Sequence, residues 1–88
     1  MDGGRIKNVK TVAQLFGVTL RRIRKERGLT QEKVAELTGV SNNFVSELER
    51  GLKAPGLVVV VNLSRALKVS VHELLADFTE TNLRGIKR

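Results

Sequence analysis

The stretch from Leu29 to Gly51, LTQEKVAELTGVSNNFVSELERG, decides the fold of this chain. Its pattern predicts two short helices, at about residues 30–38 and 41–50. Each helix opens with a hydroxyl residue whose side chain can accept a hydrogen bond from the first turn. Gly39 ends the first helix, because glycine adopts the left-handed conformation of a helix C-terminus without steric cost. The segment between the two helices is so short that they must cross steeply.

Small and apolar residues at fixed spacing hold these two predicted helices together. Ala35, Gly39 and Val45 follow Gln31 at successive offsets of four, four and six residues. Ala35 must be small because the second helix passes close over it, while Val45 and Leu48 face inward. A glycine at a turn says little by itself, but this combination between two capping residues is a strong signal. It predicts a helix-turn-helix, whose second helix enters the major groove of DNA.

Three further helices are predicted around this pair, which gives an all-α domain of five helices. Residues 11–14, TVAQ, have the form of a capping box and open an amphipathic helix that ends at Gly28. Residues 70–73, SVHE, form a second capping box before a short helix. The segment 57–68 carries conflicting signals, because its LVVVV run favours a strand. No other segment could pair with such a strand, so we predict a helix there.

The length and composition allow one compact domain with a single small core. We expect a flexible basic arm at 1–10, the helix-turn-helix domain at 11–78 and a polar basic tail at 79–88. The chain has no cysteine, which excludes disulfides and thiolate metal sites and fits a reducing, cytoplasmic setting. No secretory signal and no apolar run approaching about 20 residues is present, so no membrane partner is expected.

The charge distribution favours a polyanionic partner. Sixteen Lys and Arg oppose nine Asp and Glu, for a net charge of +7 and a pI near 10.6. The local balance is +6 over residues 1–28, −1 over 29–55 and +2 over 56–88. The excess positive charge therefore flanks the helix-turn-helix rather than filling it. This suits a protein whose flanks contact phosphates while a nearly neutral helix reads bases.

Three segments, IRKERGLTQEKVAELTGVS, FVSELERG and LSRALKVSVHELL, carry a resemblance to a known family. They resemble the Cro and phage-repressor-like (XRE) helix-turn-helix family, over roughly Phe16 to Leu75. Proteins of that family are five-helix domains of bacteria and phages that usually bind operator DNA as symmetric dimers and regulate transcription. In size the chain is similar to restriction-modification controllers, small phage repressors and antitoxins, and its residues do not separate these groups.

The resemblance implies base contacts by Asn42 and Asn43, at the first exposed positions of the second helix of the pair. An asparagine amide matches the N6 and N7 edge of adenine. Ser46 and Glu47 lie one turn further on and are also assigned to bases. Glu47 either accepts a hydrogen bond from the amino group of cytosine or only excludes wrong sequences, and both readings stay open. Five residues are assigned to DNA phosphates: Gln31, Ser41, Phe44, Arg50 and Lys53.

Three residues are also considered for structural roles. Arg24 and Glu49 match a buried ion pair of phage repressors, which would fix the first helix against the second helix of the pair. The pair is expected because Glu49 would otherwise be an anion at a helix C-terminus, an unfavourable place. Phe44 either packs against the sugar-phosphate edge or covers the core between the two helices of the motif.

The valine run after Pro55 departs from the family pattern, where polar residues are usual. Successive helical residues turn by about 100°, so the four valines cannot all face one core. We therefore predict a homodimer interface that contains Val58, Val59, Val61 and Phe78. The alternative is that residues of the arm or the tail cover this surface.

Together these features predict a sequence-specific regulator of transcription without cofactor or metal. A homodimer would present two copies of the second helix to the major groove of a pseudo-palindromic operator. The chain has no glycine-rich phosphate loop, no paired metal ligands and no nucleophile–base spacing, and its single histidine lies in a capping box. We therefore expect no catalytic residues and no enzyme. The alternative is a protein-interaction module or an antitoxin, with a toxin or another regulatory protein as its partner.

Overall fold

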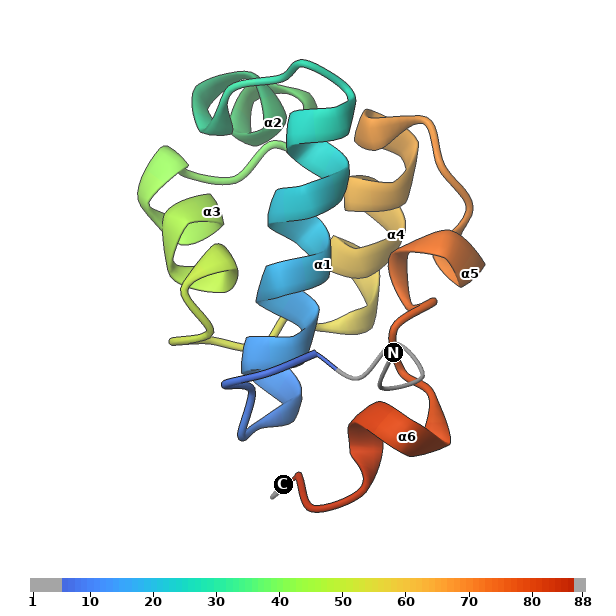
Figure 1. Ribbon diagram of the computed structural model, residues 1–88. Coiled ribbons are helices and arrows are strands. Elements are labelled where there is room, and N and C mark those ends of the chain that lie inside the picture. The colour runs from blue at the N-terminus through green and yellow to red at the C-terminus, as the bar shows by residue number, and fades with distance from the viewer. Residues whose placement is uncertain (1–5, 87–88) are drawn as a thin grey trace.

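The computed structural model describes residues 6–86, which form six helices and no strand within that range (Figure 1). The helices are α1 (Val12–Glu26), α2 (Gln31–Thr38), α3 (Asn42–Glu49), α4 (Leu57–Leu67), α5 (Val71–Leu74) and α6 (Glu80–Leu83). Helix α1 runs through the middle, with α2 and α3 on one side of it and α4 and α5 on the other. The predicted all-α class is confirmed, and the structure adds one short helix, α6, to the five expected.

Local capping by a hydroxyl side chain explains where every described helix except α4 begins. Thr30 accepts a hydrogen bond from the backbone N–H three residues on, and Ser41 does the same for α3. The predicted capping box before α5 is complete in both directions. Before α1 only half of the expected box is present, because the Gln14 side chain accepts from the N–H of Lys10 instead of the cap residue. Gly39 ends α2 with a φ of 77°, as its position predicted.

Helix α4 contains the valine run, so the helical choice for this segment is confirmed. Its inner face buries Val60, Leu63 and Leu67 in the shared core. Leu57 and Val58 remain 76% and 73% exposed, because Leu57 is the first residue of the helix and Val58 lies on the side opposite the core. Packing against α2 and α5 has overridden the strand preference of the β-branched residues.

The core joins α1 to the other helices around one cluster: Phe16, Leu20, Ile23, Val34, Ala35, Val45, Leu48, Val60, Leu63, Leu67 and Leu74. Gly17 on α1 is buried against the backbone of α3. A Cβ atom at this position would lie 2.6 Å from the carbonyl oxygen of Glu49, which is too close for any real contact. The glycine therefore lets the C-terminal end of α3 pack directly on α1.

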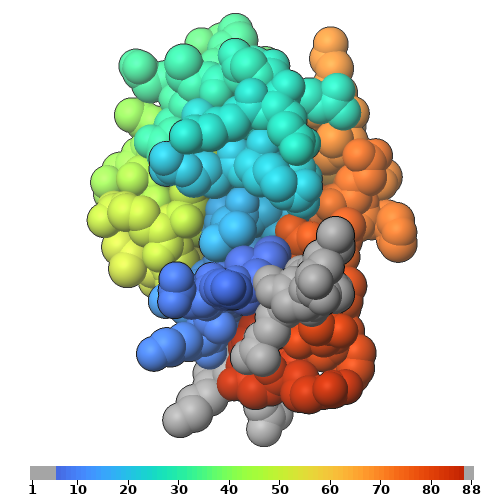
Figure 2. Space-filling model, viewed as in Figure 1, coloured from blue at the N-terminus to red at the C-terminus, as the bar shows by residue number. Residues whose placement is uncertain are grey.

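The two ends of the described chain meet at one end of the molecule (Figure 2). The N–H of Ile6 donates to Oδ1 of the buried Asn82 at 2.8 Å, and the Asn82 amide donates to the carbonyl of Asp77 at 2.9 Å. Thr79 caps α6. The segment at 79–88, which we had expected to be only a polar tail, thus includes an ordered helix within its described part.

Candidate nucleic-acid interface

Helices α2 and α3 form the tight pair that the sequence predicts. The backbone N–H groups of Gly39 and Val40 both donate to the carbonyl of Ala35, at 2.9 and 3.2 Å, which closes the C-terminus of α2. Val45 and Leu48 are completely buried, and Ala35 is only 4% exposed beneath them. Helix α3 is therefore fixed along its inner face, and its outer face is left for contact with another molecule.

Asn42 and Asn43 lie on this outer face, in the first turn of α3, and both are exposed. Neither side chain has a hydrogen bond to another residue of the described range 6–86. Ser46 and Glu47, one turn later, are half-buried. The four residues assigned to base contacts thus belong to one helix, and its N-terminal two are free to donate and accept.

Two cations at the end of α3 contact the residues assigned to bases. Arg50 Nε donates to Ser46 Oγ at 3.3 Å, and Lys53 Nζ lies 3.4 Å from Glu47 Oε1. The Lys53 side chain is 55% exposed, whereas that of Glu47 is 21% exposed. No local pattern predicts the Glu47–Lys53 pair, because the partners are six residues apart across the turn at Gly51. The Ser46–Arg50 contact has the four-residue spacing of neighbours on a helix.

The remaining residues assigned to phosphates are placed differently from one another. Ser41 is exposed and its hydroxyl caps α3 by accepting from the N–H of Phe44 at 3.0 Å. Phe44 is half-buried and packs against the core, which is the second of the two positions considered for it. Gln31 is half-buried, and its Nε2 donates to Glu49 Oε1 at 2.9 Å. This contact orients the Gln31 amide and occupies one of its two N–H groups.

Arg24 and Glu49 form a buried ion pair between α1 and α3. Two guanidinium nitrogens donate to the two carboxylate oxygens, with Nη2 3.0 Å from Oε1. The side chains are only 10% and 1% exposed. Arg24 Nη1 also donates to the carbonyl of Leu29 at 2.9 Å. The pair, with Gln31 as a third member, therefore connects α1, the loop before α2, and α3.

Other kinds of site receive no support in the described residues. No group of three or more His, Cys, Asp or Glu is placed to hold a metal ion within residues 6–86. No helix of the described chain has the length and apolar character required to cross a bilayer.

A steeply crossed helix pair with an exposed second helix defines the helix-turn-helix class of DNA-binding folds. The chain belongs to the XRE-type helix-turn-helix family, because the helix-turn-helix model HTH_3 matches its residues 20–74. The resemblance to the Cro and phage-repressor-like proteins is thereby confirmed. The HTH-type transcriptional regulator y4dJ of Sinorhizobium fredii is 41% identical over 68 residues, which span 77% of this chain and 88% of that relative.

Solved structures of two related proteins have the same fold. The restriction-modification controller protein C.AhdI from Aeromonas hydrophila is 37% identical with a TM-score of 0.69, covering 70% of this chain and 94% of its own. The P22 c2 repressor, crystallised in complex with a synthetic operator, is 34% identical with a TM-score of 0.66. That match covers 73% of this chain and 97% of the repressor chain.

Proposed function

We propose that this protein regulates transcription in the cytoplasm by binding a specific double-stranded DNA sequence through α3. The observation that carries the proposal is the outer face of this helix, where Asn42 and Asn43 are exposed and uncommitted while the inner face is locked in the core. A related repressor was crystallised with operator DNA, which supports the same use of the fold here. The net charge of +7 favours association with a polyanion.

In this proposal α3 lies in the major groove and its neighbours hold the DNA backbone. The amides of Asn42 and Asn43 read adenine edges, each bidentate contact contributing about 1–3 kcal/mol of discrimination. Ser41, at the start of α3, and Arg50, at its end, lie beside the phosphates. Gln31 has one N–H on Glu49, so its second N–H is available to a phosphate at the start of α2.

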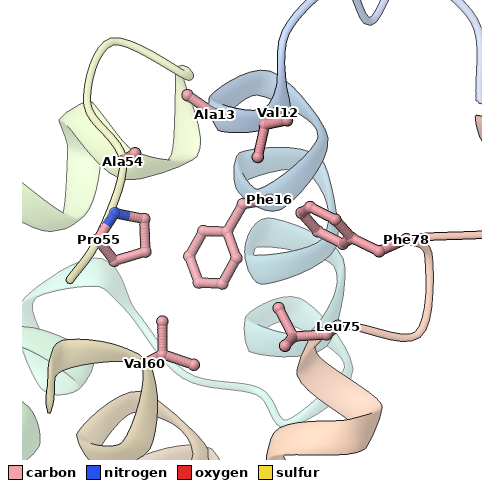
Figure 3. A pocket seen from close by; sticks show the side chains of 8 residues that line it. All are labelled: Val12, Ala13, Phe16, Ala54, Pro55, Val60, Leu75 and Phe78. Carbon is pink, nitrogen blue, oxygen red and sulfur yellow. The ribbon is translucent and has the colours of Figure 1, made fainter. Parts of the chain in front are cut away.

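We further propose that the protein acts as a homodimer through α4. Leu57, Val58 and Val61 form an exposed apolar face on this helix, at 76%, 73% and 38% exposure. Near it lies a cavity of about 160 Å³ lined by apolar side chains from α1, α4, the Pro55 loop and the segment after α5 (Figure 3). A two-fold dimer would let the apolar face of each copy cover the same region of the other.

Two residues first assigned to this interface contribute less to it than Val58 and Val61. Val59 and Phe78 are half-buried and pack against the core of their own chain. Figure 3 shows the Phe78 ring beside Phe16 at the wall of the cavity. Leu75 also lines the cavity and is 38% exposed. The exposed valines and the cavity mouth are therefore the parts that a second copy would bury.

DNA recognition is tested by selecting duplexes from a random pool with the purified protein and measuring affinity against salt. A specific reader should enrich one operator and show a steep negative slope of log affinity against log salt, while keeping its preference at high salt. Asn42→Ala with Asn43→Ala should flatten the preference at the contacted positions. The control is His72→Ala, at an exposed residue of α5. Failure to enrich any sequence, with no dependence on salt, would favour a protein-interaction module instead.

The dimer is tested by sedimentation equilibrium of the wild type and of Val58→Ser with Val61→Ser. We expect the wild type to dimerise and the double variant to sediment as a monomer, because the substitutions remove apolar surface from the interface. Leu37→Ser is the control, since Leu37 is a 49% exposed apolar residue on α2. A monomeric wild type at all protein concentrations, with or without operator DNA, would refute the interface.

A further inference from the structure

In the free protein, two residues assigned to base contacts are paired with two residues assigned to phosphate contacts. Lys53 forms an ion pair with Glu47, and Arg50 donates a hydrogen bond to Ser46, as described above. All four lie on α3 or in the loop that follows it. Lys53 cannot neutralise the Glu47 carboxylate and give its full charge to a phosphate at the same time.

We propose that Glu47 and Lys53 form an exchangeable pair, in which cytosine in the major groove replaces Lys53 at Glu47 and thereby releases Lys53 to a DNA phosphate. This inference rests on the proposed DNA-binding function and deepens it. It names the base that Glu47 selects, and it makes one phosphate contact dependent on the sequence that is bound.

The chemistry of the base edges decides when the exchange occurs. Cytosine presents an amino donor in the major groove, which can take the place of the ammonium group on Glu47. Guanine and thymine present acceptors at this edge, and these repel a carboxylate. Adenine also carries an amino donor, but its N7 acceptor lies beside that donor, so adenine replaces the ammonium group less well than cytosine does. On such sequences an uncovered Glu47 would also face the phosphates. Lys53 therefore stays on Glu47, and its phosphate contact is lost.

The geometry of the pair suits an exchange of partners. Glu47 lies within α3 and its side chain is 21% exposed, so the acceptor stays in place. Lys53 lies in the loop after α3, is 55% exposed, and carries its charge on a flexible four-carbon stem. The ammonium group of this pair is exposed to water, which screens the attraction, so moving Lys53 away from Glu47 requires little compensation.

The neighbouring Ser46–Arg50 contact provides an internal comparison. The serine hydroxyl is neutral and can both donate and accept, so losing Arg50 leaves no uncovered charge. Arg50 is therefore free to move to a phosphate on any sequence. Sequence-dependent release is expected for the pair that contains a carboxylate and not for the pair that contains a hydroxyl.

The test compares salt dependence on the operator selected by the wild type and on a shuffled duplex of the same composition. Lys53→Gln should make the negative slope of log affinity against log salt shallower by about 0.9 per protomer on the operator. It should leave the slope on the shuffled duplex unchanged. Arg50→Gln should make the slopes on both duplexes shallower by the same amount. Arg65→Gln removes an exposed cation of α4 and is the matched control, which should change neither slope.

Glu47→Gln should make the negative slope on the shuffled duplex steeper by about 0.9 per protomer, because Lys53 is then free to contact a phosphate on every sequence. The same variant should reduce the preference for cytosine at one operator position by roughly 5- to 150-fold, the cost of a mismatched base pair. Lys53→Arg should keep the difference between the two duplexes. Circular dichroism of each variant checks that the fold is retained.

The outcomes separate this inference from the function on which it rests. If no operator can be selected, the proposed function itself fails and the exchange fails with it. If an operator is selected but Lys53→Gln lowers both slopes equally, the exchange alone is wrong. Retention of every cytosine preference by Glu47→Gln would also overturn it.

Discussion

The buried ion pair between Arg24 and Glu49 allows a prediction whose size follows from the structure. Glu49 has a side chain that is 1% exposed, so Arg24→Met would leave a buried carboxylate with only the Gln31 amide as a donor. Removing one partner of such a pair costs about 3–5 kcal/mol. A domain of this size is stabilised by roughly 4–13 kcal/mol in total. The single substitution should therefore lower the melting temperature by at least about 12 °C.

Replacing both partners should be far less damaging than replacing either one. Arg24→Met with Glu49→Leu removes the two charges together and fills their space with apolar groups. The remaining cost comes from the Gln31 amide and the Leu29 carbonyl, which lose their partners but are half-buried and within reach of water. We expect the double variant to lie within about 2 kcal/mol of the wild type, with a coupling free energy above about 3 kcal/mol.

The assay is equilibrium unfolding in urea followed by far-ultraviolet circular dichroism, because the chain has neither Trp nor Tyr for fluorescence. Protein concentration must be held constant, since dimerisation would add to the apparent stability. The control is the same cycle on Lys33 and Glu36, a pair with 50% and 70% exposed side chains, where coupling should stay below about 1 kcal/mol. If both cycles gave the same small coupling, burial of the ion pair would not govern its energy as we infer.

Three further substitutions probe how the helices are held together, each by unfolding in urea. Gly17→Ala should destabilise the protein by about 1–3 kcal/mol despite alanine's better helix propensity, because the new Cβ meets the Glu49 carbonyl; a more stable variant would contradict this packing. Leu48→Ala should cost about 2–5 kcal/mol through an unfilled cavity under α3, and a loss below 1 kcal/mol would show that the core collapses around it. Asn82→Ala should cost about 1–3 kcal/mol by removing the partner of the half-buried Ile6 N–H and Asp77 carbonyl, whereas the exposed Thr81→Ala should be nearly neutral.

The sequence predicted those parts of the fold whose signals are local. Helix starts depend on a hydroxyl followed by a free N–H three residues later, and the end of α2 on the left-handed conformation of Gly39, so both can be read from neighbouring residues. The prediction of helix α4 depended on the whole chain, because its valines favour a strand and only the lack of a pairing partner for that strand favoured a helix. Helix α6 was missed because it is short and polar, and because Asn82 bonds to Ile6, 76 residues earlier in the chain.

In the candidate site, too, some features follow from neighbouring residues and others depend on how the helices pack. The exposure of Asn43 follows from helical periodicity once the inward positions of Val45 and Leu48 are known, and that of Asn42 follows from its place as the first residue of α3. The hydrogen bond from Gln31 to Glu49 joins residues 18 positions apart on different helices, so it depends on the crossing of α2 and α3. No periodic pattern encodes such a contact.

Helix α3 has only eight residues, too few for an isolated helix to be stable in water. Its direction must therefore come from its inner contacts: the carbonyls that rest on Gly17, the ion pair of Glu49, and the buried Leu48. These contacts lie mainly at the C-terminal end of α3, whereas Asn42 and Asn43 lie in its first turn, yet they set the angle at which those amides project. A displacement of α3 by about 1 Å would separate an amide from its hydrogen-bond partners on a base, because such bonds weaken steeply with distance and angle. Sequence preference should consequently be as sensitive to α1, which has no proposed base contact, as to the residues that touch DNA.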